Sequence, residues 1–154
     1  MTFKDKIENY RQTVSSLKAE LCAGISEELQ AAVKNSKYIK AVRFEAYTPY
    51  FNDGEPCIYR VHEPRVQFFN QDEDIETEYE DGFISPWDLE YTWENGWGSK
   101  RIYKEGSEEK GQALEEIHAL ITSIPKEIIE DAYGDGVQVT ITADGVTVEE
   151  YDHD

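Results

Sequence analysis

The first part of the chain places its apolar residues at helical spacing. Steps of four and three residues, and later of four, separate Phe3, Ile7, Tyr10, Val14, Leu17, Leu21, Ile25, Leu29 and Val33. Because residues three and four apart lie on one face of a helix, residues 2–34 are predicted to form a long amphipathic helix. Gly24 is a point where this helix can kink or divide, with Ser26 as a second N-cap. We expect the helix to cover a sheet, and a dimer zipper through residues 3–33 is the alternative.

The chain then changes to the period of a β-strand. In residues 38–47, apolar side chains alternate with Arg43 and Glu45, which predicts a half-buried strand with one polar face. A second strand is expected at residues 57–62, with an extension at residues 66–69. The simplest layout for these strands is antiparallel.

Two helices and a hairpin are predicted in the final third. Residues 107–123 carry an apolar face at helical spacing, and a shorter helix around Ile128 and Ile129 ends at Tyr133-Gly134. Strict alternation then indicates two strands joined at Asp144-Gly145, a dipeptide typical of type I′ turns. A two-residue turn at that dipeptide pairs Ala143 with Val146, Ile141 with Val148, and Val139 with Glu150.

Residues 71–101 carry conflicting signals. Ser85-Pro86-Trp87-Asp88 is a capping box with proline at the first helical position. Apolar and polar residues nevertheless alternate from Leu89 to Glu94, and Asn95-Gly96 is typical of a hairpin turn. We expect a mostly irregular excursion over residues 66–106 that contains a single short element.

These elements predict one domain of the α+β class over residues 1–154. Helices and antiparallel strands occur in the order α-ββ-excursion-α-ββ, which favours two layers. We expect a roughly four-stranded antiparallel sheet covered by helices, with the acidic and aromatic excursion inserted between the two halves.

The charge of the chain is negative and unevenly distributed. The formal net charge is -18 at pH 7, from 33 acidic residues against 15 Lys and Arg. Residues 66–99 and residues 127–154 contain no Lys or Arg, and together they hold 19 of the acids. The remainder is nearly neutral. Direct binding to nucleic acid is disfavoured, because it requires Lys and Arg to displace counterions from phosphates.

Large aromatic residues share the first acidic stretch, including all three tryptophans of the chain. Aromatic side chains anchor protein interfaces, and carboxylates steer association with a basic surface. The alternative is that the rings fill a core beneath a loop while the acids only solvate its outside. The predicted partner-binding residues are Asp72, Glu73, Asp74, Glu76, Glu78, Tyr79, Trp87, Tyr91, Trp93 and Trp97.

Two short acidic groups offer ligands for a divalent metal ion. The first is Asp53 and Glu55 in the turn-rich loop predicted over residues 49–56, and the second is the terminal Asp152, His153 and Asp154. Carboxylates combined with histidine suit Mg²⁺, Mn²⁺ or Zn²⁺. Turn chemistry and a solvated tail are the simpler interpretations of these residues. No other feature of the sequence implies a cofactor.

No motif in the sequence identifies a reaction. The chain lacks a P-loop, a Rossmann glycine pattern, a nucleophile elbow, a His-Glu-x-x-His motif and paired-cysteine zinc spacing. Cys22 and Cys57 are interpreted as reduced packing thiols. Because no signal peptide and no apolar run of roughly 20 residues occurs, we expect a soluble, cytoplasmic protein without a membrane partner.

Two blocks of the chain resemble sequences known from other proteins. One block is Tyr47-Thr48-Pro49-Tyr50-Phe51-Asn52-Asp53-Gly54-Glu55-Pro56-Cys57. The other runs from Tyr133-Gly134-Asp135-Gly136-Val137 to Glu150-Tyr151-Asp152-His153-Asp154. Both are similar to blocks in a family of small uncharacterised proteins encoded by bacteria and bacteriophages. The resemblance implies a prokaryotic or phage intracellular setting, and it implies no catalytic residue.

Together these observations favour a non-catalytic interaction protein that binds a basic partner surface, of the inhibitor or DNA-mimic type. Two alternatives remain open. One is a metal-binding module or metal-dependent enzyme that uses the two acidic groups, and the other is a homo-oligomer assembled through residues 3–33. The orientation of Trp87, Trp93 and Trp97 discriminates between a partner site, which needs outward rings, and simple surface solvation.

Overall fold

The computed structural model describes residues 1–51, 53–70 and 82–152. Helices, strands and one 3₁₀ turn follow one another in this part of the chain. The elements are α1 (Phe3–Asn35), β1 (Ile39–Tyr47), β2 (Arg60–Val61), β3 (Arg65–Phe68), η1 (Pro86–Asp88), β4 (Tyr91–Trp93), β5 (Arg101–Tyr103), α2 (Glu108–Ser123), α3 (Lys126–Tyr133), β6 (Val137–Thr142) and β7 (Gly145–Glu150).

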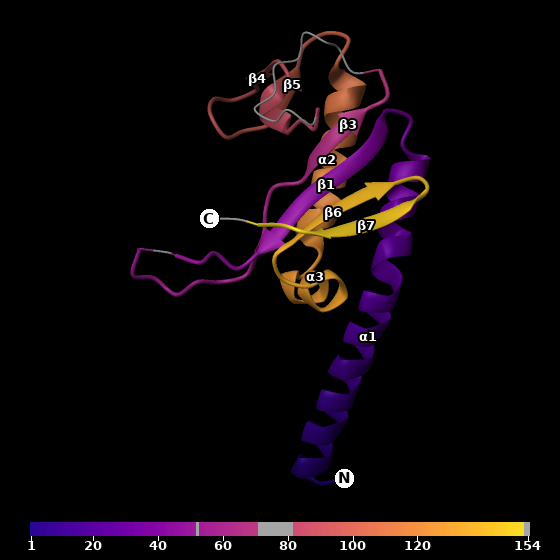
Figure 1. Ribbon diagram of the computed structural model, residues 1–154, viewed down its shortest axis with the longest axis vertical. Coiled ribbons are helices and arrows are strands. Elements are labelled where there is room, and N and C mark those ends of the chain that lie inside the picture. Colours follow the sequence, from indigo (N-terminus) through magenta and orange to yellow (C-terminus); the bar gives the residue numbers. More distant parts are fainter. Residues whose placement is uncertain (52, 71–81, 153–154) are drawn as a thin grey trace.

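Strand β1 lies at the centre of a five-stranded antiparallel sheet (Figure 1). One edge of β1 pairs with β6, which pairs in turn with β7, and the other edge pairs with both β2 and β3. A single bridge between Val66 and Ile84 continues the sheet beyond β3. Strands β4 and β5 form a separate hairpin. The α+β prediction is confirmed, with five strands in the main sheet where roughly four were expected.

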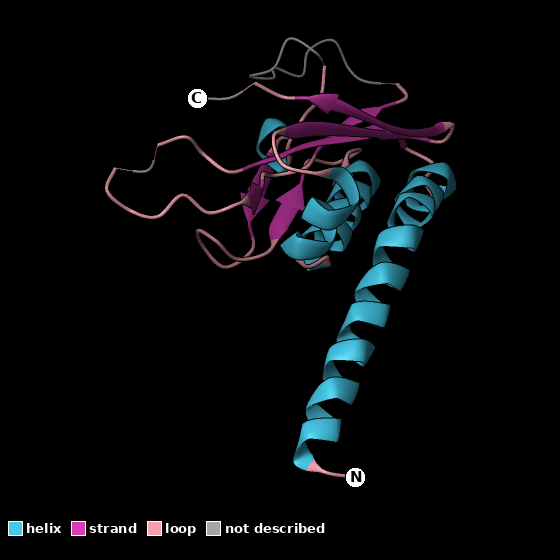
Figure 2. Cartoon of the chain, turned by 60° about the horizontal axis from the view of Figure 1, so that its bottom comes forward, coloured by secondary structure: helices cyan, strands magenta, loops and turns pink. Residues whose placement is uncertain are grey.

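The helices lie against one face of the sheet, so the fold has two layers (Figure 2). The alternation along β1 sends Val42 and Phe44 to this face, where both are fully buried. They belong to the same core cluster as Leu29 of α1, Ile121 of α2 and Ile129 of α3. Burying each such side chain contributes about 1.5–3 kcal/mol. This shared core positions α2 and α3 across the sheet.

Helix α1 was expected to cover the sheet. Only its C-terminal part does so. It runs without interruption through Gly24, and only Ile25, Leu29 and Val33 are buried. Its N-terminal part extends away from the sheet and from α2 and α3 (Figures 1 and 2). A helix of 33 residues is about 50 Å long, whereas a nine-residue strand such as β1 spans about 30 Å. Despite this length, no helix in the described part of the chain could span a membrane.

The second predicted strand is shorter than expected. Residues 57–59 lie outside β2, and β3 begins at Arg65, beyond Pro64. Proline has no N–H to donate to a neighbouring strand, which accounts for the separation of β2 from β3. Cys57 is exposed, so its interpretation as a packing thiol is wrong, whereas Cys22 is half-buried against the core.

The C-terminal hairpin forms, but its register differs from the predicted one. Its turn consists of Ala143 and Asp144, neither of which has a positive φ, so it is not a type I′ turn. Gly145 is already part of β7. The pairing of the two strands is shifted by two residues, so the same side chains stay on the apolar face. Buried Val139 now lies opposite Val148 and not opposite Glu150 as predicted. The observed pairs include Val139–Val148, Ile141–Val146 and Thr142–Gly145.

The sequence between residues 85 and 103 carried signals for both a helix start and a β-hairpin, and the structure contains a short version of each. The Asp88 carboxylate accepts a hydrogen bond from the Ser85 N–H at 2.8 Å and closes the capping box of η1. Strands β4 and β5 then form a hairpin. Residues 94–100 connect them, and Gly96 and Gly98 take positive φ there, in place of a two-residue turn. Three short elements, η1, β4 and β5, therefore occur where one was expected.

Candidate protein-binding site

Four aromatic side chains gather at the β4–β5 hairpin, and we call them the aromatic cluster. Trp87 comes from η1, Tyr91 and Trp93 from β4, and Trp97 from the connecting loop. The ring centroids of Trp87, Tyr91 and Trp93 lie 5.2–6.4 Å from one another, and that of Trp97 lies 6.4 Å from Trp93. The structure thus brings together four of the predicted partner-binding residues.

The guanidinium group of Arg101 lies among three of these rings. Its Cζ atom is 4.5 Å from the ring centroid of Trp87 and 5.1 Å from the centroids of both Tyr91 and Trp93. At these distances a cation is attracted to the faces of aromatic rings. Arg101 was not predicted from the sequence, because its contact with the rings arises only when β5 pairs with β4 and places it opposite Trp93.

Helix α2 supports the hairpin through Tyr103 and Glu115. The Tyr103 ring packs so closely on Gly111 that a Cβ atom there would lie 2.3 Å from it. The Tyr103 hydroxyl donates a hydrogen bond to Glu115 Oε1 at 2.8 Å, and Nη1 of Arg101 lies 3.6 Å from the same oxygen. Burial, followed by the contact with Glu115, raises the pKa of Tyr103. One carboxylate therefore holds two side chains of β5.

The outer rings of the aromatic cluster face solvent. Trp97 is 86% exposed and Trp87 is 53% exposed, whereas Tyr91 and Trp93 are half-buried. Isolated apolar side chains on a surface are common, but a contiguous group of them is typical of an interaction site. The interpretation that all these rings fill a core beneath a loop is therefore wrong.

The charge beside the aromatic cluster is more balanced than the sequence suggests. Glu90 and Glu94 are exposed, but the pairing of β4 with β5 brings basic residues next to them. The Lys104 ammonium lies 3.3 Å from the Glu90 carboxylate. Exposed pairs of this kind contribute about 0–1 kcal/mol. The other predicted partner-binding residues, Asp72, Glu73, Asp74, Glu76, Glu78 and Tyr79, lie outside the described residues.

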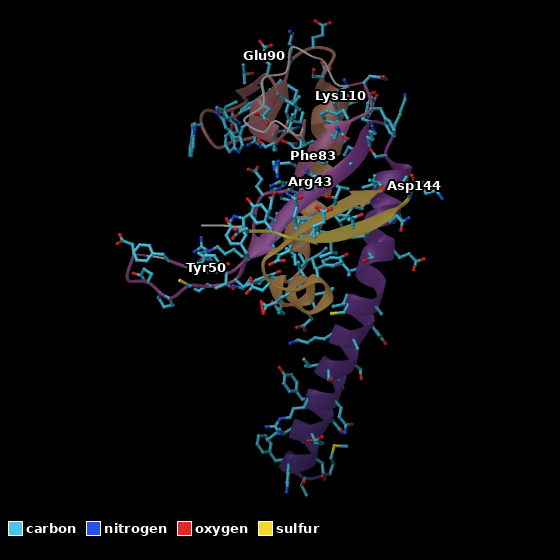
Figure 3. All side chains as sticks on the ribbon, viewed as in Figure 1. Arg43, Tyr50, Phe83, Glu90, Lys110 and Asp144 are labelled. Carbon is cyan, nitrogen blue, oxygen red and sulfur yellow. The ribbon has the colours of Figure 1, made fainter. Side chains whose placement is uncertain are left out.

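Phe83, a further aromatic residue of the acidic stretch, faces inward. Its ring centroid lies 4.2 Å from Cζ of Arg43, whose Nε donates a hydrogen bond to the Thr140 hydroxyl at 3.0 Å. Figure 3 shows Arg43 and Phe83 beside each other over the sheet. The aromatic residues of this stretch thus divide between packing, as at Phe83, and exposure, as at Trp97.

A polar cavity of about 340 Å³ adjoins the aromatic cluster, and Trp87 forms part of its lining. Glu45, Arg65 and Ser85 also line it, and they are the buried polar or charged side chains of the described part of the chain. Glu45 was expected on a polar face of β1, and its burial was not predicted from the sequence. Alternation gives the face on which a residue lies, but not what covers that face.

The two buried charged side chains of this cavity are paired with each other. Arg65 on β3 forms an ion pair with Glu45 on β1. Glu45 Oε1 also accepts a hydrogen bond from Nε2 of Gln138 at 3.2 Å. A buried ion pair is tolerated only when both members have such partners. We interpret this pair as a support that fixes β3 beside the aromatic cluster.

The two predicted metal-binding groups are not assembled in the described part of the chain. Asp53 and Glu55 are exposed on the loop between β1 and β2, and Asp152 is exposed after β7. Among the described residues, no three His, Cys, Asp or Glu side chains form a group that could hold a metal ion. His153 and Asp154 lie outside the described residues.

The segments after β1 and before β6, which belong to the two sequence blocks described above, meet at the end of β1. Thr48 donates hydrogen bonds from both its N–H and its hydroxyl to the Asp135 carboxylate, each at 2.7 Å. The ring centroids of Tyr47 and Tyr151 lie 5.7 Å apart. Beyond these contacts the loop extends away from the sheet, with Tyr50 exposed on it (Figures 1 and 3).

Comparisons of the chain with protein-family models, with curated proteins and with solved structures gave no match. The function is therefore inferred from the chemistry of the side chains themselves. The aromatic cluster is the strongest candidate site, because it combines exposed rings with a rigid support.

Proposed function

We propose that this protein is a non-catalytic interaction protein whose aromatic cluster binds a basic partner surface. The observation that carries the proposal is the outward orientation of Trp97, on a hairpin that contacts α2, and of Trp87 on the neighbouring η1. Tryptophan is prominent among the residues that dominate binding energy at protein interfaces. A rigid group of such rings loses little conformational entropy on binding.

The arrangement around Arg101 supports a basic partner. Three rings of the cluster already accept a guanidinium group from this chain. The exposed face of Trp97 offers the same chemistry to an Arg or Lys from outside, since the face of an aromatic ring carries partial negative charge. The net charge of -18 favours the approach of a positively charged surface.

The setting that we propose follows the family resemblance. A cytoplasmic protein of bacterial or phage origin would meet basic surfaces mainly on nucleic-acid-binding proteins. An inhibitor or a DNA mimic is the form of interaction protein that suits such a partner. This part of the proposal depends on the resemblance and not on the geometry of the cluster.

Tryptophan fluorescence provides a direct test, because every tryptophan of the chain belongs to the aromatic cluster. We would titrate the protein with a peptide rich in Lys and Arg and, separately, with an acidic peptide of equal length. The basic peptide should change the emission, and the change should weaken as salt is raised. Trp97→Ala should reduce the affinity by roughly tenfold.

Phe51→Ala is the matched control, because Phe51 is an aromatic residue of similar exposure, at 77%, on the loop between β1 and β2. It should leave the affinity for the basic peptide unchanged. Equal binding of the two peptides, or equal loss of affinity in both variants, would show that the aromatic cluster is not the binding site.

A further inference from the structure

Helix α1 presents an apolar stripe to solvent along its N-terminal part. Phe3, Tyr10, Leu17 and Leu21 are each more than half exposed, and Ile7 is 38% exposed. Val14, between them, is half-buried. The spacing of four and three residues aligns these side chains on one face over three heptads. The contact of α1 with the core begins with Cys22 and Ile25.

A groove continues the apolar stripe onto the body of the protein. It has a volume of about 430 Å³ and is lined by the end of the stripe at Leu21, by Ile25, and by Leu120, Ile124 and Ile128 of the α2–α3 region. Glu20 and Glu28 of α1 also line it. A partner that follows the stripe from Phe3 therefore reaches an apolar recess at its end. A second helix has the shape to occupy both, since helices pack side by side at 8–10 Å.

The charge of the partner is inferred from the residues that flank the apolar stripe. Lys4, Arg11 and Lys18 recur at intervals of seven along one side. The corresponding positions on the other side are Lys6, Thr13 and Glu20. In paired helices these flanking positions select the partner and its orientation through their charges. A partner helix with acidic residues along its own flanks would neutralise Lys4, Arg11 and Lys18.

A second copy of this chain fits the flanks poorly. If two α1 helices pair antiparallel, with Phe3 opposite Leu21 of the second copy, Arg11 faces Arg11 and Lys4 faces Lys18. On the other flank Lys6 faces Glu20, but the like-charge pairs outnumber these opposite-charge pairs. If they pair parallel, Lys6 of one copy lies beside Arg11 of the other. The negatively charged remainders of the two chains then lie at the same end of the helix pair. Each orientation sets like charges against each other, which is destabilising.

We infer that the stripe from Phe3 to Leu21 is a docking surface for an acidic amphipathic helix of another protein. The apolar residues supply the contact area, and Lys4, Arg11 and Lys18 pair with the acidic flank of that helix. The groove beside Leu21 receives the apolar residue at the end of the partner. This surface is separate from the aromatic cluster, so the inference does not rest on the proposed function.

The probe for this inference is a pair of synthetic helical peptides of about four heptads, both with Ile and Leu on the apolar seam. One carries Glu at all flanking positions and the other carries Lys. The full chain, labelled with a fluorophore, is titrated with each peptide and followed by anisotropy. The Glu peptide should bind at least tenfold more tightly, and raising salt from about 50 mM to about 500 mM should weaken its binding.

Two variants of the full chain sharpen the test. Lys4→Glu/Arg11→Glu/Lys18→Glu should reverse the preference, so that the Lys peptide binds more tightly. The matched control, Lys37→Glu/Lys100→Glu/Lys126→Glu, changes the same amount of charge at three exposed lysines outside the stripe. It should retain the preference for the Glu peptide. The stripe is exposed, so circular dichroism should show both variants folded.

Equal affinity for the two peptides would overturn the inference, as would equal effects of the two triple variants. Light scattering decides whether a second copy is the true occupant. A dimer that Leu17→Lys dissolves, and that salt strengthens, would also overturn the inference in favour of self-association. A monomer that binds the Glu peptide supports it.

Discussion

The guanidinium group of Arg65 on β3 is paired with the carboxylate of Glu45 on β1, and only 4% and 7% of the two residues is exposed. Glu45 was expected on a polar strand face, where it would meet water. The pair is instead enclosed next to Ser85 and Trp87 in the cavity beside the aromatic cluster. Its strength therefore bears on how firmly the candidate site is held.

Removing one member of this pair should be strongly destabilising. Glu45→Gln leaves the Arg65 guanidinium buried without its counter-charge, and such changes lower the free energy of unfolding by about 3–5 kcal/mol. The double variant Glu45→Met/Arg65→Met should recover much of this loss, because it removes both charges. Urea denaturation measures the three proteins. A single variant as stable as the wild type would mean that water reaches the pair.

Leu29→Ala and Leu17→Ala test which part of α1 belongs to the core. Leu29 is 1% exposed and Leu17 is 53% exposed on the same helix. Truncation at Leu29 should lower the free energy of unfolding by about 2–5 kcal/mol, because it leaves a cavity. Truncation at Leu17 should change it by less than about 0.5 kcal/mol. Similar losses in both variants, measured by chemical denaturation, would contradict the exposure of the N-terminal part.

Gly111→Ala and Gly24→Ala should have opposite effects on stability. Alanine favours a helix over glycine by about 1 kcal/mol at either position. At Gly24 nothing lies within 4 Å of the new Cβ atom, so the variant should be stabilised. At Gly111 the Cβ atom would lie 2.3 Å from the Tyr103 ring, so overpacking should cost about 1–3 kcal/mol. Thermal unfolding gives the sign of each change, and a stabilised Gly111→Ala would place Tyr103 away from α2.

The buried tyrosines should make the protein sensitive to alkaline pH. Burial, followed by the negative charges of Glu130 and Asp135, raises the pKa of Tyr59. Above its ordinary pKa of about 10 the unfolded chain ionises Tyr59 while the folded chain keeps it neutral. The stabilising contribution is therefore complete below about pH 10 and is lost as the pH rises further.

Tyr59→Phe separates this effect from packing. The variant loses the hydrogen bond from the Tyr59 hydroxyl to the Gly134 carbonyl, 3.2 Å long, and should be about 1 kcal/mol less stable at neutral pH. Its stability should then decline less steeply than that of the wild type between about pH 10 and pH 11. Parallel declines in the two proteins would indicate that other groups control the alkaline limit.

Features that depend on contacts between residues close in the sequence were predicted correctly, whereas features that depend on contacts between distant residues were not. The helix at residues 107–123 and the capping box formed by Ser85 and Asp88 depend on contacts between residues close in the sequence. Both are found in the structure. The hairpin at residues 137–151 forms as expected, but its register sets Ile141 of the core opposite Val146, which packs against that core, and does not follow the local preference of Asp144-Gly145.

The aromatic residues of the candidate site were predicted from the sequence, but the basic residue that contacts them was not. The composition of residues 66–99 indicated Trp87, Tyr91, Trp93 and Trp97, which the structure gathers into one cluster. Arg101 could not be predicted, because its place among the rings depends on the pairing of β4 with β5 and on Glu115 of α2.

By itself the sequence determined which faces of this protein are apolar, since the period of hydrophobic residues follows directly from helix and strand geometry. The stripe of α1 is one such face over its whole length. Only the tertiary structure decided where that face is covered, because burial requires a second surface at the right distance. The sheet and α3 supply that surface from Ile25 onward, whereas most of the apolar side chains from Phe3 to Leu21 are exposed.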